Sequence, residues 1–174
     1  NPLDFHKDAP LAAEAAMAAH AQGKFWEMHD LLFQDTKKLS RDDLIGYAQQ
    51  LGLDMERFTR ELDEGTHKAK IKADQELAGL VSARGTPNFF INGRQMSGAK
   101  SLDEFKTIID EELKKAKALL EQGTPLESLY ERIIARGKVF SELDDVVHDI
   151  PAEGSPTLGP DSAHVTVTVF SDFE

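Results

Sequence analysis

Cysteine is absent from all 174 residues of this chain. Without cysteine the chain can form neither a disulfide nor a zinc–thiolate site, and it offers no thiolate nucleophile. Long apolar runs are also missing, since none approaches the roughly 20 residues that a membrane-spanning helix needs. Basic residues are outnumbered by acidic ones, 20 against 31, and the net charge is −11. Because nucleic-acid binding relies on cations that neutralise phosphate, this charge argues against nucleic acid as a main partner.

The residues that are present suffice for one ordinary domain with a substantial core, because 40% of them are hydrophobic. No signal peptide is visible at Asn1, and the first residue is not methionine. We therefore expect the chain to be an internal piece of a longer protein.

Residues 85–97 form the most informative stretch. Pro87 cannot donate a hydrogen bond to a neighbouring strand, so it belongs at the start of a strand rather than inside one. Phe89-Phe90-Ile91 is typical of a short buried strand. Asn92-Gly93 favours the positive φ angles of a two-residue hairpin turn, and Arg94-Gln95-Met96 is expected to return as the second strand.

Helical patterns lie on both sides of this hairpin, over about residues 10–83 and 101–137. The expected helix starts are marked by capping residues: Ser40, Asp54, Ser101 and the segment Thr124-Pro125-Leu126-Glu127. Phe25, Trp26 and Phe33 are interpreted as core side chains between helices and sheet.

Composition changes after residue 140. Residues 141–164 contain several prolines and glycines, which is typical of a linker or a surface arm. Residues 165–170 alternate valine with threonine and give the strongest strand pattern in the chain, with one face buried and Val169 packed in the core. We expect this strand to pair with Phe89–Ile91, either within the chain or across a dimer, because an isolated strand would expose an aggregation-prone edge.

Four separated pieces together resemble a DsbA-like thioredoxin domain of the type with a helical insertion. These pieces are residues 1–6, 12–33, 85–93 and 167–174. The resemblance implies an α/β fold, a thioredoxin-like sheet with inserted helices at about 10–83 and a C-terminal strand that completes the sheet in cis or by swapping. The implied division is a core over 1–140, a linker arm over 141–164 and a strand over 165–174.

The order of these pieces differs from that of a single such domain, because the strand that should come first comes last. In the family, the residue after Glu174 would be the first cysteine of Cys-x-x-Cys. Two explanations stay open: a tandem array of repeats, or a terminal strand that closes the sheet. In the second case the sheet belongs to the same chain, as in a circular permutant, or to a neighbouring chain, as in a dimer formed by strand exchange.

The resemblance also assigns site residues. Thr86-Pro87 corresponds to the cis-proline pair, so Gly85, Thr86 and Pro87 are the implied contacts for extended peptide or protein substrates. Phe173 and Glu174 would stand directly before the redox motif. No residue of this chain is assigned a catalytic role, and no cofactor is implied. Val169 occupies a position where the family often has a buried acid, which puts ordinary redox tuning in doubt.

No metal site is expected. Asp172 and Glu174 are two acids at a strand end, a spacing that is common by chance, and no His-x-x-x-His pair occurs. The histidines His6, His20 and His29 are interpreted as capping or surface residues.

The family implies thiol–disulfide exchange, which requires a thiolate, so we predict that this chain alone is redox-inactive. Whether the chain belongs to an enzyme is left undecided at this stage. The alternative is a non-redox peptide-binding or scaffold module that uses the proline groove. A periplasmic or cell-envelope location is implied by the resemblance only.

Overall fold

The computed structural model describes residues 2–3, 6–135, 150 and 154–173. The chain divides into two compact units, one of residues 1–76 with 171–174 and the other of residues 77–170. The first unit contains the helical insertion, and the second contains the sheet. Of the predicted linker arm over 141–164, residues 141–149 and 151–153 lie outside the described residues, so the predicted division at residue 140 stays a prediction.

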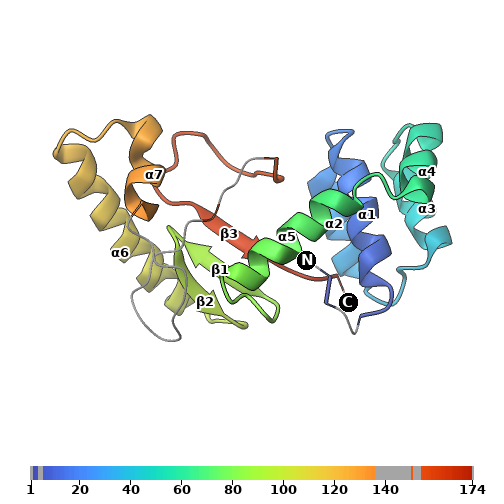
Figure 1. Cartoon of the computed structure of the whole chain (residues 1–174), viewed down its shortest axis with the longest axis horizontal. Coiled ribbons are helices and arrows are strands. Elements are labelled where there is room, and N and C mark those ends of the chain that lie inside the picture. The colour runs from blue at the N-terminus through green and yellow to red at the C-terminus, as the bar shows by residue number, and fades with distance from the viewer. Residues whose placement is uncertain (1, 4–5, 136–149, 151–153, 174) are drawn as a thin grey trace. The chain divides into compact units, whose positions relative to one another are not determined.

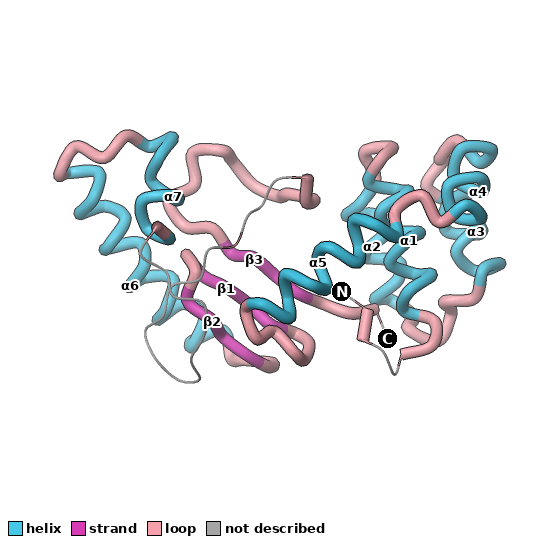
Figure 2. The backbone as a smooth tube through the Cα atoms, in the orientation of Figure 1, coloured by secondary structure: helices cyan, strands magenta, loops and turns pink. Residues whose placement is uncertain are grey.

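The first unit consists of helices (Figures 1 and 2). It holds α1 (Ala9–His20), α2 (Phe25–Gln34), α3 (Arg41–Gln50), α4 (Met55–Glu64) and the first part of α5 (Lys68–Leu80). Alanine makes up much of α1, and most of its residues are buried. Because alanine side chains are small and favour the helix, α2 and α4 can pack closely against α1.

The ends of these helices follow the sequence patterns. Ser40 and Asp43 form a reciprocal capping box at the start of α3, and the Asp54 side chain accepts a hydrogen bond from Arg57 N–H at the start of α4. Gly65 ends α4 with a φ of 63°, a left-handed conformation that glycine adopts without strain. The predicted caps at Ser40 and Asp54 are confirmed.

The second unit contains a sheet of three short strands in the order β2-β1-β3, within the described residues. The strands are β1 (Asn88–Ile91), β2 (Arg94–Ser97) and β3 (Val167–Phe170), and both pairings are antiparallel. Asn92 and Gly93 have φ angles of 48° and 82°, as a tight two-residue hairpin requires. The predicted hairpin is therefore confirmed, and β3 completes the sheet within the same chain.

Helix α6 (Leu102–Glu121) packs against β1, where the Phe105 ring meets the Phe89 ring edge to face at 4.9 Å. The predicted cap at Ser101 is confirmed, as a capping box with Glu104. On the other face of the sheet, Phe90 and Phe170 stack edge to face at 5.6 Å. They belong to a buried cluster that also includes Ala78, Val81, Ala83 and Ile150.

The segment after α6 differs from its prediction. Pro125 adopts an extended backbone and no side chain caps the next turn, so residues 126–128 form a 3₁₀ turn (Leu126–Ser128) before α7 (Leu129–Ile134). The cap predicted at Thr124 is therefore wrong, and the predicted helix end at Gly137 lies outside the described residues. No described helix is long and apolar enough to cross a bilayer.

Candidate functional site

The predicted peptide contacts Gly85, Thr86 and Pro87 form a loop that leads directly into β1. The Thr86-Pro87 peptide bond is cis. Gly85 is exposed, and Thr86 and Pro87 are half-buried. The Pro87 carbonyl oxygen accepts a hydrogen bond from Gly98 N–H at 2.9 Å, whereas no described residue hydrogen-bonds the backbone N–H or C=O of Thr86.

The base of this loop is fixed by the buried Asn88 side chain. Its Oδ1 accepts a hydrogen bond from Gln95 Nε2 at 3.1 Å, and its Nδ2 lies 3.4 Å from Ser97 Oγ. Gln95 Nε2 also lies 3.5 Å from the carbonyl oxygen of Ser82. These contacts tie the start of β1 to β2 and to the turn after α5, so they hold the loop in one place.

The register of the sheet places the end of β3 beside this loop. Asn88, the residue after Pro87, is paired with Phe170, the last residue of β3. The backbone that enters β1 and the backbone that leaves β3 therefore lie at the same end of the sheet. This is the juxtaposition predicted for the tail strand and the proline loop.

The burial of the β3 side chains differs from the prediction. Phe170 is buried, but Val167 is 42% and Val169 is 49% exposed. Side chains alternate along a strand, and the burial of Phe170 against Phe90 turns the two valines toward the less covered face. The interpretation of Val169 as a core residue is therefore wrong.

The tail after β3 is anchored within the helical unit by Asp172, which is 6% exposed. Its Oδ2 accepts a hydrogen bond from Leu3 N–H at 2.8 Å and lies 2.7 Å from His6 Nδ1, while Phe173 N–H donates to its Oδ1 at 2.8 Å. His6 is thus a partner of the tail and not the capping or surface residue that was expected. No pattern in the sequence connects these residues, because they lie at opposite ends of the chain.

Phe173 is buried in the core of the helical unit. Its ring lies 5.1 Å from the Phe33 ring and 5.9 Å from the His29 ring. Phe33 itself is 41% exposed, so its assignment to the core is wrong, and Phe25 and Trp26 are only partly buried. Glu174, the second residue predicted to precede a redox motif, lies outside the described residues.

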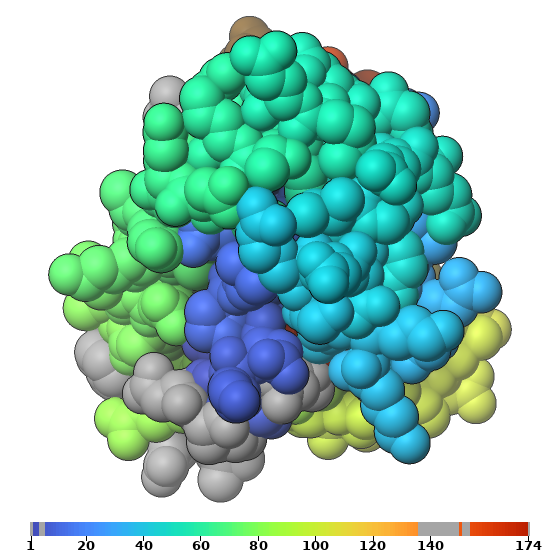
Figure 3. Space-filling view, turned by 90° about the vertical axis from the view of Figure 1, so that its right-hand side faces the viewer, coloured from blue at the N-terminus to red at the C-terminus, as the bar shows by residue number. Residues whose placement is uncertain are grey.

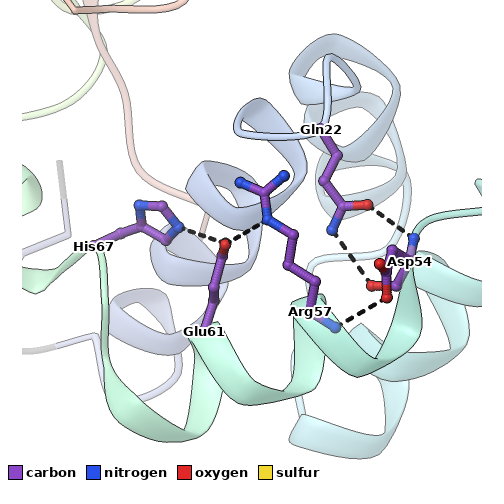
Figure 4. Close-up of polar contacts among 5 residues, drawn as sticks. All are labelled: Gln22, Asp54, Arg57, Glu61 and His67. Carbon is purple, nitrogen blue, oxygen red and sulfur yellow. Dashed lines mark hydrogen bonds and ion pairs between the residues drawn. The ribbon is translucent and has the colours of Figure 1, made fainter.

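A second polar cluster surrounds the buried Glu61 (Figure 4). Its carboxylate lies 2.7 Å from Arg57 Nε and 2.9 Å from His67 Nε2. Burial alone would raise the pKa of Glu61, but the hydrogen bonds from His67 and Arg57 outweigh it and lower the pKa. Since every carboxylate oxygen is paired inside the helical unit, we assign the cluster a structural role.

The same close-up shows how α4 is joined to the end of α1. Gln22 Oε1 accepts a hydrogen bond from Asp54 N–H at 2.8 Å, and Gln22 Nε2 donates to the Asp54 carbonyl oxygen at 3.4 Å. The described residues include no group of three or more histidine or acidic side chains that could hold a metal ion.

The family model of the DSBA-like thioredoxin domain matches residues 2–110 of this chain. Among curated proteins, the chain is 43% identical over 106 residues to a protein named Na(+)/H(+) antiporter NhaA 1 from Salinispora arenicola, a match that covers 61% of this chain and 16% of that protein. It is 40% identical over 120 residues to Na(+)/H(+) antiporter NhaA 3 from Salinispora tropica, with 69% and 18% covered. It is 41% identical over 97 residues to Na(+)/H(+) antiporter NhaA from Herminiimonas arsenicoxydans, with 56% and 16% covered.

The chain thus spans less than a fifth of the length of these relatives. No solved structure matches the chain significantly. The family match covers more than half of the chain and includes the inserted helices, the proline loop and the hairpin. This chain belongs to the family of DsbA-like thioredoxin domains.

Proposed function

We propose that this chain is the peptide-docking part of a DsbA-like thiol–disulfide oxidoreductase whose sulfur chemistry is supplied by a Cys-x-x-Cys motif outside these 174 residues. The observation that carries the proposal is the register that sets Asn88 opposite Phe170. It brings the proline loop and the strand that would lead into a redox motif to the same end of the sheet.

In this proposal an extended peptide lies along the loop of Gly85, Thr86 and Pro87. The Thr86 N–H and C=O have no hydrogen-bond partner among the described residues, so they can pair with a peptide backbone as an added strand does. Gly85 leaves open space where a side chain would stand, since no atom of the described residues other than its chain neighbours lies within 4 Å of a Cβ built there. A peptide can therefore approach the backbone closely.

Thiol–disulfide exchange proceeds by attack of a thiolate on a disulfide sulfur, which yields a mixed disulfide and releases the other sulfur as a thiolate. This chain has no cysteine and hence no thiolate. We therefore expect the chain to bind peptide without exchanging disulfides. An insulin-reduction or thiol-oxidation assay should stay at background, and turnover above background would contradict this part of the proposal.

Peptide binding is tested by NMR titration with an unstructured, cysteine-free peptide. We expect the largest amide shifts at Thr86, Asn88 and Phe170. The Gly85→Val variant should weaken binding about tenfold or more, because the new side chain occupies the space over the loop, where a Cβ has no close neighbour among the described residues. The matched control is Gly79→Val, since Gly79 also has open space around it. Equal affinities of the two variants would contradict the assignment.

The second candidate is a peptide-binding or scaffold module without redox chemistry. The sequence of the parent protein after Glu174 separates the two: Cys-x-x-Cys there supports the oxidoreductase, and any other sequence supports the scaffold. We also propose a periplasmic or cell-envelope location, on the basis of family membership. Appearance of the epitope-tagged parent protein only in the cytosolic fraction would contradict that location.

The domain division and the oligomeric state belong to the same proposal. We propose a core over residues 1–140, a linker arm over 141–164 and a strand over 165–174 that pairs within its own chain. In such a closed monomer, β3 pairs with β1 of its own chain. Light scattering coupled to size exclusion should give a monomer mass, and a concentration-independent dimer would favour strand exchange.

The antiporter names describe much longer relatives, and we do not transfer transport activity to this chain.

A further inference from the structure

A small pocket in the helical unit is separate from the proline loop and is not used by the proposed function. Its volume is about 290 Å³, and its lining residues are Pro2, Pro10, Glu14, Lys68, Ile71 and Gln75. This volume lies just below the range for drug-sized ligands, so the pocket fits a small group. Figure 3 shows the face of the helical unit on which blue atoms of the N-terminal residues lie beside the green atoms of α5.

Glu14 lines this pocket and carries an unsatisfied acceptor. The residue is 4% exposed, and its Oε2 is buried without a hydrogen-bond partner among the described residues. Its Oε1 lies 3.8 Å from Lys68 Nζ, which is beyond hydrogen-bond range, and the Lys68 side chain is 72% exposed. A buried carboxylate oxygen without a donor costs free energy, because the water that solvated it in the unfolded chain has not been replaced.

The charge of Glu14 is also incompletely balanced. Burial raises the pKa of Glu14, and the nearby charges of Lys68 and His67 only partly oppose this. His67 Nε2 is already paired with Glu61. A ligand that brings a positive charge and a hydrogen-bond donor to Oε2 would therefore supply both of the missing interactions.

The remaining walls favour an organic cation over a metal ion. Pro2, Pro10 and Ile71 offer apolar surface for a short aliphatic stem. Gln75 Nε2 donates to the Pro2 carbonyl oxygen at 2.6 Å and so holds Pro2 at the pocket. A divalent cation such as Ca²⁺ requires six to eight oxygen ligands, and a single carboxylate cannot provide them.

We propose that this pocket binds a primary alkylammonium group, with the ammonium at the Glu14 carboxylate in place of the Lys68 ammonium and its methylene stem against Pro2, Pro10 and Ile71. The group could belong to a free small amine or to a lysine side chain of a bound peptide, since both present the same chemistry. Lys68 must swing away from Glu14 when the ligand enters, which its exposure allows.

The test is an NMR titration of the whole chain at pH 7 and low salt with n-butylammonium, with Nα-acetyl-lysine amide and with the neutral n-butanol. We expect saturable amide shifts at Glu14, Ile71 and Gln75 with an ammonium probe and much smaller ones with n-butanol. Binding of n-butylammonium alone would identify a free amine as the ligand, and tighter binding of the lysine derivative would identify a peptide side chain.

Two variants with opposite expected effects on ligand affinity test the proposal. Glu14→Gln keeps the shape but removes the charge, so affinity should fall about tenfold or more. Lys68→Gln removes the competing ammonium, so affinity should rise severalfold. The exposed Glu64→Gln serves as the matched control and should bind as the wild type does. The proposal is overturned if neither ammonium probe binds, if n-butanol binds equally well, or if Glu14→Gln, shown to be folded by its thermal melt, binds unchanged.

Discussion

The helical unit and the sheet unit differ in how their cores are assembled. The helical core combines neighbouring helices, and among the described residues Phe173 is the one member of that buried cluster from the far end of the chain. The sheet core instead joins segments that are distant in sequence, including Phe90, Ile150 and Phe170. Val167 and Val169 of the same sheet stay exposed. Most of the helical core is thus closed by packing between neighbouring helices, whereas the sheet depends on one distant strand.

The largest expected effect comes from a matched pair of phenylalanines, one in each unit. Phe58 is 0% and Phe90 is 1% exposed. Replacing Phe58 with alanine should cost about 3–5 kcal/mol of unfolding free energy, because the cavity lies in the larger cluster. Phe90→Ala should cost less, since the smaller sheet core can collapse around it. Urea unfolding followed by circular dichroism measures both losses of unfolding free energy. A larger loss for Phe90→Ala than for Phe58→Ala would contradict this expectation.

The tail anchor should give the next largest effect. Asp172→Asn removes the charge that accepts from Leu3 N–H and meets His6, so we expect a loss of about 1–3 kcal/mol. Hydrogen exchange should become faster at the Leu3 amide in particular. The exposed Asp161→Asn is the control and should change stability by less than about 0.5 kcal/mol. Unchanged exchange at Leu3 in Asp172→Asn would show that the anchor contributes nothing.

Two buried glutamates of the helical unit should respond to pH with opposite signs. The pKa of Glu61 is lowered, so ionised Glu61 stabilises the fold above the ordinary value of 4.5, and this contribution is lost as the pH falls through the folded pKa. The pKa of Glu14 is raised, so its protonated form favours folding below 4.5, and this contribution is lost as the pH rises through the folded pKa.

Glutamine at each position therefore separates the two carboxylates. At pH 7, Glu61→Gln should lower the unfolding free energy by about 1–2 kcal/mol, whereas Glu14→Gln should leave it unchanged or raise it. Both differences should shrink at pH 3. Thermal unfolding of the two variants across this range is the measurement, and the same sign for both at pH 7 would refute the assignment.

The smallest effect is expected at Val169, a half-exposed position of β3. Val169→Thr should change stability by less than about 0.5 kcal/mol, because the side chain is half exposed and threonine keeps the β-branched shape. Phe170→Ala on the neighbouring position should cost several times more. A loss above about 1 kcal/mol for Val169→Thr would mean that the Val169 side chain is buried in solution.

Much of the fold can be predicted from short patterns in the sequence. The caps at Ser40, Asp54 and Ser101 and the Asn92-Gly93 turn each depend on a few consecutive residues, and each is found in the structure. The cap at Thr124 failed because Pro125 holds an extended backbone and delays the helix. The pattern identified the type of element there but not its first turn.

The candidate site is harder to predict from the sequence, because its geometry depends on residues that are far apart along the chain. The Val-Thr alternation of β3 indicated a strand but could not decide which face is buried, and Phe170 against Phe90 makes that choice. The contact of His6 with Asp172 joins the two ends of the chain and has no local pattern. The unpartnered oxygen of Glu14 likewise becomes visible only once α1 and α5 are folded.

The pairing of β3 with β1 inside one chain is tested most directly by isotope-filtered NOE spectroscopy on a mixture of labelled and unlabelled protein. Asn92 N–H donates to Thr166 O, so Asn92 and Thr166 form a hydrogen-bonded pair. Because the two kinds of pair alternate along an antiparallel ladder, Phe89 and Val169 form a pair without mutual backbone hydrogen bonds. The Cα protons of such a pair lie close together. We predict a strong Cα-proton NOE between Phe89 and Val169 within one molecule and slow exchange of the Thr168 and Phe170 amides. An NOE seen only between molecules, or rapid exchange of both amides, would contradict it.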